Sequence, residues 1–475
     1  MDGAAMATQC GIPPGESFTY EIHAQQSGTY WLHGHFRGDQ ADGLRAPLII
    51  RDRYSAQQYD EDVLISLEDW YPSESDPKMA EILAPNTFGP PPATFPFGLI
   101  NGYNGNDTRP IQFVPGRRYR FRVISMSSTE YWKFSIPGHK LEVIEADGVA
   151  SEPCLVDGIQ LGPAQRYSVI VTARESYDYN FIYNCTLYAD FVPRVAGLNP
   201  RIYTGLIEYR QDAPIMKYDI VGDDQLVWAD DINMRALDGE PELPVDRQIV
   251  LETRGFITTE RRNLRKLGSL PYAEPLVPSI FTAMTMGELA MDSRVYGPQT
   301  QAFIFPYNQS VEILLKNPQG QPHVQHSHGG TFQIIEVGPV DHSELEEPPT
   351  GNFTLADVPI IPVRRYTGTP MRRDTVNVPP FSYVKLRFRA NNPGVWLHHC
   401  HISPTHNEAG LTVTFVVAPD VMQKTQTIPD SLIQMCKRQG IKTIGNAAGN
   451  QGYDLTGLPL VPIELPGSTT NVPPA

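Results

Sequence analysis

The sequence of 475 residues predicts an all-β protein made of β-sandwich or barrel units in tandem. Short segments alternate apolar and polar side chains, as half-buried strands do, at 119–123, 168–172, 384–390 and 411–416. The 44 prolines and 38 glycines fall between such segments and favour short strands joined by turns. At about 150 residues per domain, the length allows about three units.

An internal repeat supports the tandem arrangement. Residues 18–35 and 384–401 share one pattern: a strand ends at Ala, two amide residues and a Gly follow, and a His-x-His pair begins five residues after that Gly. A fainter copy at 166–173 has no histidines. We therefore expect three related β units, with metal chemistry in the first and third only.

The expected organisation follows from this repeat and from the composition between its copies. A segment at 211–244 is acidic and has few strand patterns, so it is expected to be a linker. The predicted parts are a first unit at 1–52, a second at 53–210, the linker at 211–244, a third unit at 245–420 and a tail at 421–475 that begins with a helix near 430–438.

Charge and hydropathy exclude several classes of partner. The net charge of −15 without basic blocks argues against nucleic acid. No run of about 18 apolar residues is present, so no membrane span is expected. The opening segment 1–10 has no basic flank and no apolar stretch, so it is not a signal peptide. We expect a monomer that acts on small molecules.

Eight of the 12 histidines fall into three short clusters, which are the main evidence for function. Because strand side chains alternate between faces, His399 and His401 should face one way and Cys400 the other. The clusters are His33 and His35, then His323, His326 and His328, then His399, His401 and His406. Imidazole and thiolate at these spacings suit copper, and His323, Cys400 and His406 form the two-His, one-Cys set of a blue-copper centre.

Simpler interpretations are less favoured by this pattern. A lone His-x-His pair is usually a surface or core feature, but three clusters, two of them in a repeated frame, reverse that expectation. Zinc suits His and Cys ligands as well, but structural zinc sites are closed sets in short loops. The four histidines outside the clusters are expected to be ordinary surface or loop residues: His23, His139, His342 and His398.

The motifs at Gly28–His35, His323–His328 and Gly394–Leu411, with 144–148 and 371–374, resemble those of multicopper oxidases. The resemblance is closest to ascomycete laccases and iron-uptake ferroxidases. It implies cupredoxin-like Greek-key sandwiches, with the first domain incomplete, and up to four copper ions. Carried over by motif, type 1 copper would take His323, Cys400 and His406, type 2 copper His326, and the type 3 pair His33, His35, His328, His399 and His401.

The sequence departs from the family pattern at three places. The family's His-Trp-His-Gly motif is absent, so two of ten cluster histidines are missing and the trinuclear set is expected to be incomplete. The loop after Cys400 has one extra residue before His406, and Ser403 stands where the family often has an acid. Leu411, at the axial position, cannot ligate copper. Asp2 would match an acid near the cluster.

The resemblance implies an enzyme of the secretory pathway that couples one-electron oxidations to reduction of O2. The expected substrate is a phenolic or polyketide-derived metabolite. The alternative is Fe(II), for which Glu145 and Glu252 would be the carboxylates, and a further alternative is a copper-poor remnant. By the same resemblance Cys10 would pair with Cys436, and Cys154 with Cys185.

Overall fold

The computed structural model describes residues 2–51, 57–85, 97–104, 108–176, 178–188, 201–218, 225–345 and 361–461. Its strands form five sheets, which confirms the all-β prediction. Within this described part of the chain, no helix has both the length and the apolar character needed to cross a membrane.

Three sheets belong to the first half of the chain. The smallest pairs β1 (Gly28–His33) with β2 (Arg45–Ile50). A six-stranded sheet has the order β4 (Phe97–Ile100), β3 (Glu61–Trp70), β6 (Arg118–Ser125), β11 (Arg166–Thr172), β8 (Leu141–Ala146) and β9 (Val149–Val156). A five-stranded sheet has the order β10 (Gly158–Leu161), β7 (Tyr131–Ser135), β12 (Phe181–Tyr188), β13 (Arg201–Glu208) and β5 (Ile111–Gln112).

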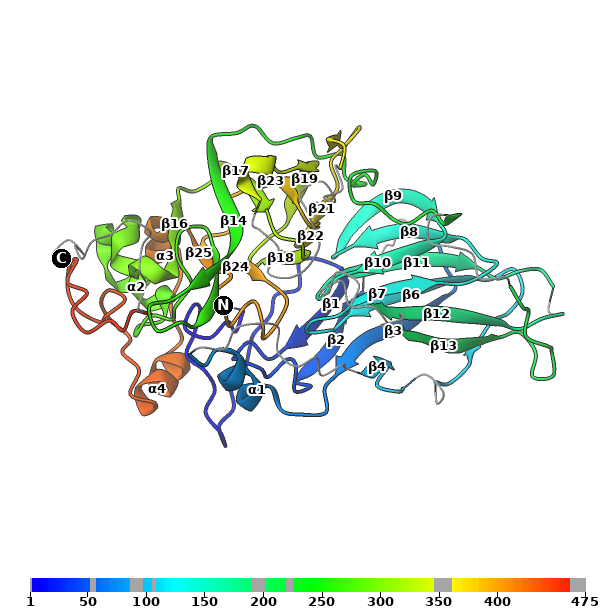
Figure 1. Cartoon of the computed structure of the whole chain (residues 1–475), viewed down its shortest axis with the longest axis horizontal. Coiled ribbons are helices and arrows are strands. Elements are labelled where there is room, and N and C mark those ends of the chain that lie inside the picture. The colour runs from blue at the N-terminus through cyan, green and yellow to red at the C-terminus, as the bar shows by residue number, and fades with distance from the viewer. Residues whose placement is uncertain are drawn as a thin grey trace.

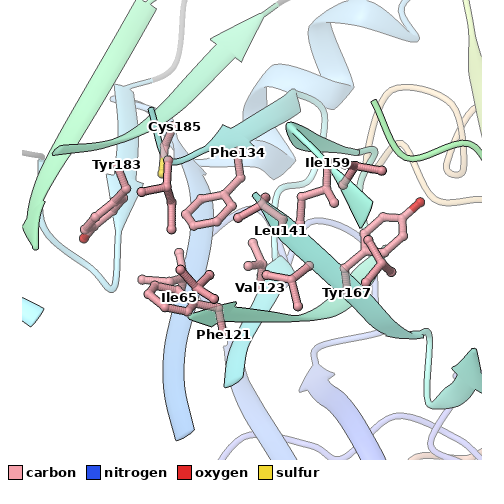
Figure 2. Packing of buried hydrophobic residues seen from close by; sticks show 14 of the residues in the cluster. Ile65, Phe121, Val123, Phe134, Leu141, Ile159, Tyr167, Tyr183 and Cys185 are labelled. Carbon is pink, nitrogen blue, oxygen red and sulfur yellow. The ribbon is translucent and has the colours of Figure 1, made fainter. Parts of the chain in front are cut away.

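The six- and five-stranded sheets enclose one apolar core. Figure 2 shows side chains from both sheets in this core, with Phe121 and Val123 of β6 near Phe134 of β7. All three are fully buried. The predicted strands at 119–123 and 168–172 are confirmed as β6 and β11, and their apolar positions form this core.

The second half of the chain forms the other two sheets. A seven-stranded sheet has the order β15 (Asn263–Leu267), β14 (Arg247–Ile257), β17 (Ser310–Asn317), β23 (Ser382–Arg389), β19 (Phe332–Pro339) and β20 (Arg364–Arg365), with β21 (Arg372–Arg373) also paired to β19. A five-stranded sheet has the order β16 (Ala302–Phe305), β25 (Thr412–Val417), β24 (Gly394–Cys400), β18 (His323–Ser327) and β22 (Thr375–Val378). In Figure 1 this half lies beside the first, and β1 and β2, in blue, lie at the centre.

The helices are short, and all except α1 belong to the second half of the chain. They are α1 (Ser75–Ile82), α2 (Ser279–Thr285), α3 (Pro419–Thr425), α4 (Asp430–Arg438) and the 3-10 turns η2 (Gly287–Met291), η3 (Ser293–Tyr296), η4 (Pro298–Thr300) and η5 (His342–Glu344). The helix predicted near 430–438 is confirmed as α4. It carries Cys436, which forms the expected disulfide with Cys10 across a Cα–Cα distance of 5.6 Å.

The other expected disulfide is wrong, because Cys154 and Cys185 are free thiols. Cys154 lies on the edge strand β9 of the six-stranded sheet and is only half-buried. Cys185 lies on β12 of the other sheet and is fully buried in the core, beside Tyr183 and Phe134 in Figure 2. The two thiols therefore occupy different sheets and different environments.

The strand predicted before the first His-x-His pair is also absent. Residues 18–24 have no regular secondary structure, and Ile22 is 71% exposed. A strand needs a neighbour for its backbone groups, and in the part of the chain that the structure describes no strand pairs with this segment. The repeat is therefore real only from Gly28 and Gly394 onwards, at β1 and β24. The domain limits stay a prediction.

Candidate functional site

The first candidate site is the buried trio His323, Cys400 and His406. The Sγ atom of Cys400 lies 3.7 Å from Nδ1 of His323 and 3.5 Å from Nδ1 of His406. No residue of the trio is more than 2% exposed. The extra residue in the loop is accommodated by a turn in which the His406 amide donates to the carbonyl of Ile402, so His406 still reaches the site.

Strand pairing explains how the trio is separated from the other histidines. In the β18–β24 register, Gln325 lies opposite Cys400 and His326 lies opposite His399. Directly opposed residues share a face, and successive residues alternate. Cys400 therefore points into the second-half core, whereas His326 and His399 point to the other side, as the spacing predicted.

Burial sets the protonation of this trio. Burial, followed by the charge of Arg265, lowers the pKa of His323 to about 3, and burial holds the pKa of His406 well below its ordinary value. Burial raises the pKa of the Cys400 thiol to about 12. Both imidazoles are thus neutral and able to donate lone pairs, and the thiol releases its proton only when a metal binds. Leu411 is fully buried beside them and offers no ligand atom.

The second candidate site collects six imidazoles from three segments. Nε2 of His399 lies 3.2 Å from Nε2 of His328 and 3.4 Å from Nε2 of His35. The ring of His401 lies 5.1 Å from that of His33 and 5.6 Å from that of His326, between centroids. All six predicted histidines are therefore brought together: His33 and His35 at the end of β1, His326 and His328 at the end of β18, and His399 and His401 at the end of β24.

Hydrogen bonds to one nitrogen of three of these rings aim the other nitrogen at the cluster. Nδ1 of His33 donates to the carbonyl of Gly34 at 2.8 Å, and Nδ1 of His399 donates to the carbonyl of Cys400 at 3.0 Å. Nδ1 of His326 contacts the carbonyl of Asp374 and the hydroxyl of Thr375, both at 3.0 Å. This arrangement fixes ring orientation and leaves Nε2 for a metal.

The electrostatics of the second site also suit a cation. Burial lowers the pKa of His33 to about 4 and that of His35 to about 3, and burial with repulsion from neighbouring imidazoles holds the pKa of His399 and His401 well below the ordinary value. Nδ1 of His401 is buried without a hydrogen-bond partner among the described residues. Neutral imidazoles with free nitrogens, beside a Cys-containing set, fit copper.

Asp2 lies at the second site, as expected. Its Oδ2 is 2.5 Å from Nδ1 of His328, and its Oδ1 accepts a hydrogen bond from the Thr8 hydroxyl. Burial acts to raise the pKa of Asp2, but His328 outweighs it and holds that pKa far below its usual range. Asp2 therefore stays ionised and orients the His328 ring.

The structure does not bring Glu145 or Glu252 to either cluster. Glu145 is buried in an ion pair with Arg120 and accepts a hydrogen bond of 2.7 Å from the Thr29 amide. It ties β1 to the six-stranded sheet. Glu252, on β14, pairs with Arg254 at 2.8 Å.

Glu408 is an acid that does lie near the first site, two residues after His406. Burial, followed by repulsion from Glu274, raises its pKa to about 7. Two smaller effects act on the same pKa: Arg37 lowers it and Asp76 raises it. The loop of the first site thus carries one carboxylate, Glu408, which is repelled by a second, Glu274, from another segment.

Sequence reasoning missed the groups that hold the ligands in place. Asp374 accepts two hydrogen bonds of 2.7 Å from Arg166, and its own backbone orients His326. Gln319 accepts from Nε2 of His323 at 2.9 Å. The sequence shows 371–374 only as a motif and Arg166 only as the start of a histidine-free repeat, because the contacts of these residues join segments that are distant along the chain.

Comparisons with known proteins agree with this geometry. Three family models, each described as multicopper oxidase, match residues 1–55, 61–210 and 270–421. An iron transport multicopper oxidase of Schizosaccharomyces pombe, fio1, is 35% identical over 482 residues, covering 99% of this chain and 73% of that protein. The iron transport multicopper oxidase FET5 of Saccharomyces cerevisiae is 32% identical and covers 99% of this chain and 76% of its own length.

Two solved structures extend the comparison to three dimensions. The crystal structure of Fet3p, a multicopper oxidase that functions in iron import, matches with a TM-score of 0.83 and 28% identity, covering 98% of this chain and 86% of that chain. The laccase from Botrytis aclada matches with a TM-score of 0.70 and 24% identity, over 92% of this chain and 79% of that chain, and shares the fold. This chain belongs to the multicopper oxidase family, copper-dependent oxidoreductases that use O2.

Proposed function

We propose that this multicopper oxidase is a ferroxidase, which takes single electrons from Fe(II) at the trio His323, Cys400 and His406. The observation that carries the proposal is the pair of metal-binding clusters joined at β24, in a chain whose relatives at 31 to 35% identity are named for iron. This replaces the phenol-oxidising interpretation as the main one.

Bound copper would supply one-electron oxidation at the first cluster and reduction of O2 to water at the second, where this sequence provides six histidines and the family pattern has two more. The chain's own residues place the two clusters in direct succession. Cys400 lies between His399 and His401, so the ligand of one site is joined through single peptide bonds to ligands of the other. Burial keeps water away from the trio, and the ionised Asp2 orients the His328 ring at the second cluster.

The carboxylates proposed for Fe(II) differ from those that the sequence indicated. Glu145 and Glu252 are held in ion pairs elsewhere, whereas Glu408 and Glu274 lie together at the loop that carries His406. A dication between two repelling carboxylates would relieve their repulsion. Phenol oxidation is the second candidate, because Glu145 and Glu252, the two carboxylates expected to bind iron, form ion pairs instead.

The test compares the two substrates on the copper-loaded chain under air. We expect kcat/KM for Fe(II) to exceed that for an electron-rich phenol. We expect Glu408→Gln to raise the apparent KM for Fe(II) at least tenfold while changing phenol oxidation less than twofold, and the matched Glu252→Gln control to change neither. A wild type that prefers the phenol, with no effect of Glu408→Gln on Fe(II), would overturn the ferroxidase in favour of the second candidate.

A further inference from the structure

Gln325, in the middle of β18, carries a buried amide. Its side chain is fully buried, and neither its Nε2 nor its Oε1 has a hydrogen-bond partner among the described residues. Gln333, which is also buried, is satisfied: it donates to the carbonyl of Pro241 at 2.8 Å and accepts from the amide of Leu243 at 2.9 Å. Because an unpaired buried amide is costly, Gln325 calls for an explanation.

The register of the sheet places this amide beside the first site. Gln325 is directly opposite Cys400 in the β18–β24 pair, so both side chains lie on the same face. Their Cβ atoms are then about 5 Å apart, within the reach of a glutamine side chain. The histidines of the second cluster, His326 and His399, face away from it.

A second unpaired group on this face can orient the amide. His398 lies opposite Ser327, and its Nδ1 is 2.6 Å from the Ser327 hydroxyl. Where Ser327 donates to Nδ1, Nε2 of His398 carries a proton, and this buried Nε2 has no partner among the described residues. Gln325 and His398 are diagonal neighbours across the strand pair, a spacing that long side chains span. The histidine donor can hold Oε1 and leave Nε2 of Gln325 directed toward Cys400.

A metal-bound thiolate is the acceptor that such a donor requires. The Cys400 sulfur lies between the imidazoles of His323 and His406 in a site without solvent. Hydrogen bonds to the cysteine sulfur are among the factors that tune the potential of blue-copper sites. The reduced site carries one positive charge fewer, so its sulfur is the more negative and the stronger acceptor. A donor at the sulfur therefore favours reduction.

We propose that the Gln325 amide donates a hydrogen bond to the Cys400 thiolate when copper is bound, and thereby raises the reduction potential of that site. Gln325 is then a positioning residue that acts through the sulfur and does not bind metal. The inference rests on the copper assignment of the proposed function, and it is independent of whether the substrate is Fe(II).

The test uses the copper-loaded full chain and Gln325→Leu. The reduction potential is measured by titrating the blue absorption against a one-electron mediator, and the copper–sulfur vibrations are recorded by resonance Raman in H2O and D2O. We expect the equilibrium constant for reduction to fall about tenfold, which is 59 mV for one electron, and the D2O sensitivity of the vibrations to diminish. Making the site more apolar would by itself raise the reduction potential. A lower potential in Gln325→Leu therefore cannot be explained by the loss of polarity and indicates the loss of the hydrogen bond.

Two further variants distinguish an effect on the reduction potential from an effect on the stability of the fold. Gln325→Met, which is unbranched and has no donor, should behave like Gln325→Leu. Gln333→Leu removes a satisfied buried glutamine from the same half of the chain, so it should lower the melting temperature and leave the potential unchanged. Gln325→Leu should not lower the melting temperature, because it removes an unpaired amide.

The outcomes distinguish the claims. An unchanged or higher potential in Gln325→Leu, with unchanged D2O sensitivity, overturns the proposal, as does a Gln325→Leu protein that binds no blue copper. A wild type without a blue band overturns the copper assignment and this proposal together. A blue wild type that does not oxidise Fe(II) overturns only the iron substrate.

Discussion

Replacing Asp374 by Asn tests the buried ion pair that holds the second cluster to the first half of the chain. The Asp374 carboxylate accepts two hydrogen bonds of 2.7 Å from Arg166, whose side chain is 3% exposed. Removing one partner of a buried pair leaves the other charge uncompensated and costs about 3–5 kcal/mol. Since Asp147 remains 3.5 Å from Arg166, we expect the lower value, about 3 kcal/mol.

For a chain of 475 residues the shift is about 1 °C per kcal/mol, so that loss lowers the melting temperature of the copper-free chain by roughly 3 °C, measured by circular dichroism. Arg166 also fixes the segment whose backbone carbonyl, at Asp374, orients His326, so the variant should hold less copper at the second cluster by metal analysis. The control is Glu152→Gln, which breaks an exposed pair with Arg235 and should cost less than about 1 kcal/mol. If Asp374→Asn melts no lower than this control, the pair does not carry the stability assigned to it.

Three further predictions concern charge, cross-linking and metal. Burial lowers the pKa of His139 from 6.5 to about 4, so its contribution to stability is full above pH 6.5 and is lost as the pH falls toward 4. Urea titrations should show that the wild type loses about 2 kcal/mol more stability between pH 7 and 5 than His139→Phe does. Cys10→Ser should cost about 2–5 kcal/mol in the same assay, whereas Cys154→Ser, at a half-buried free thiol, should cost far less. Cys400→Ser should abolish the blue absorption of the copper-loaded chain, and a band that survives would show that the ligand is wrong.

The histidine clusters could be predicted because their chemistry is local in sequence. Alternation along a strand separates Cys400 from His399 and His401 without knowledge of any distant segment, and the structure has that separation. The same local logic found the strands β6 and β23, since their patterns are set by one buried face.

The predictions that were wrong depend on residues that are neighbours in space but distant in sequence. Residues 18–24 have a strand pattern, yet a pattern provides no pairing partner, and the segment remains irregular. The motif around Glu145 predicts an Fe(II)-binding carboxylate, but Arg120 and Thr29, which are distant in sequence, bind that carboxylate instead. Cys154 and Cys185 are on different sheets, which spacing along the chain does not reveal.

The assembly of the second cluster from three segments has a consequence for folding. His35 and His399 are 364 residues apart in the chain, and the disulfide between Cys10 and Cys436 spans 426. Such non-local contacts form late, after the intervening sheets have closed. The six imidazoles therefore converge only near the end of folding, so a copper donor that acts earlier meets isolated histidine pairs. Correct metal loading thus reports that both halves of the chain have folded and docked.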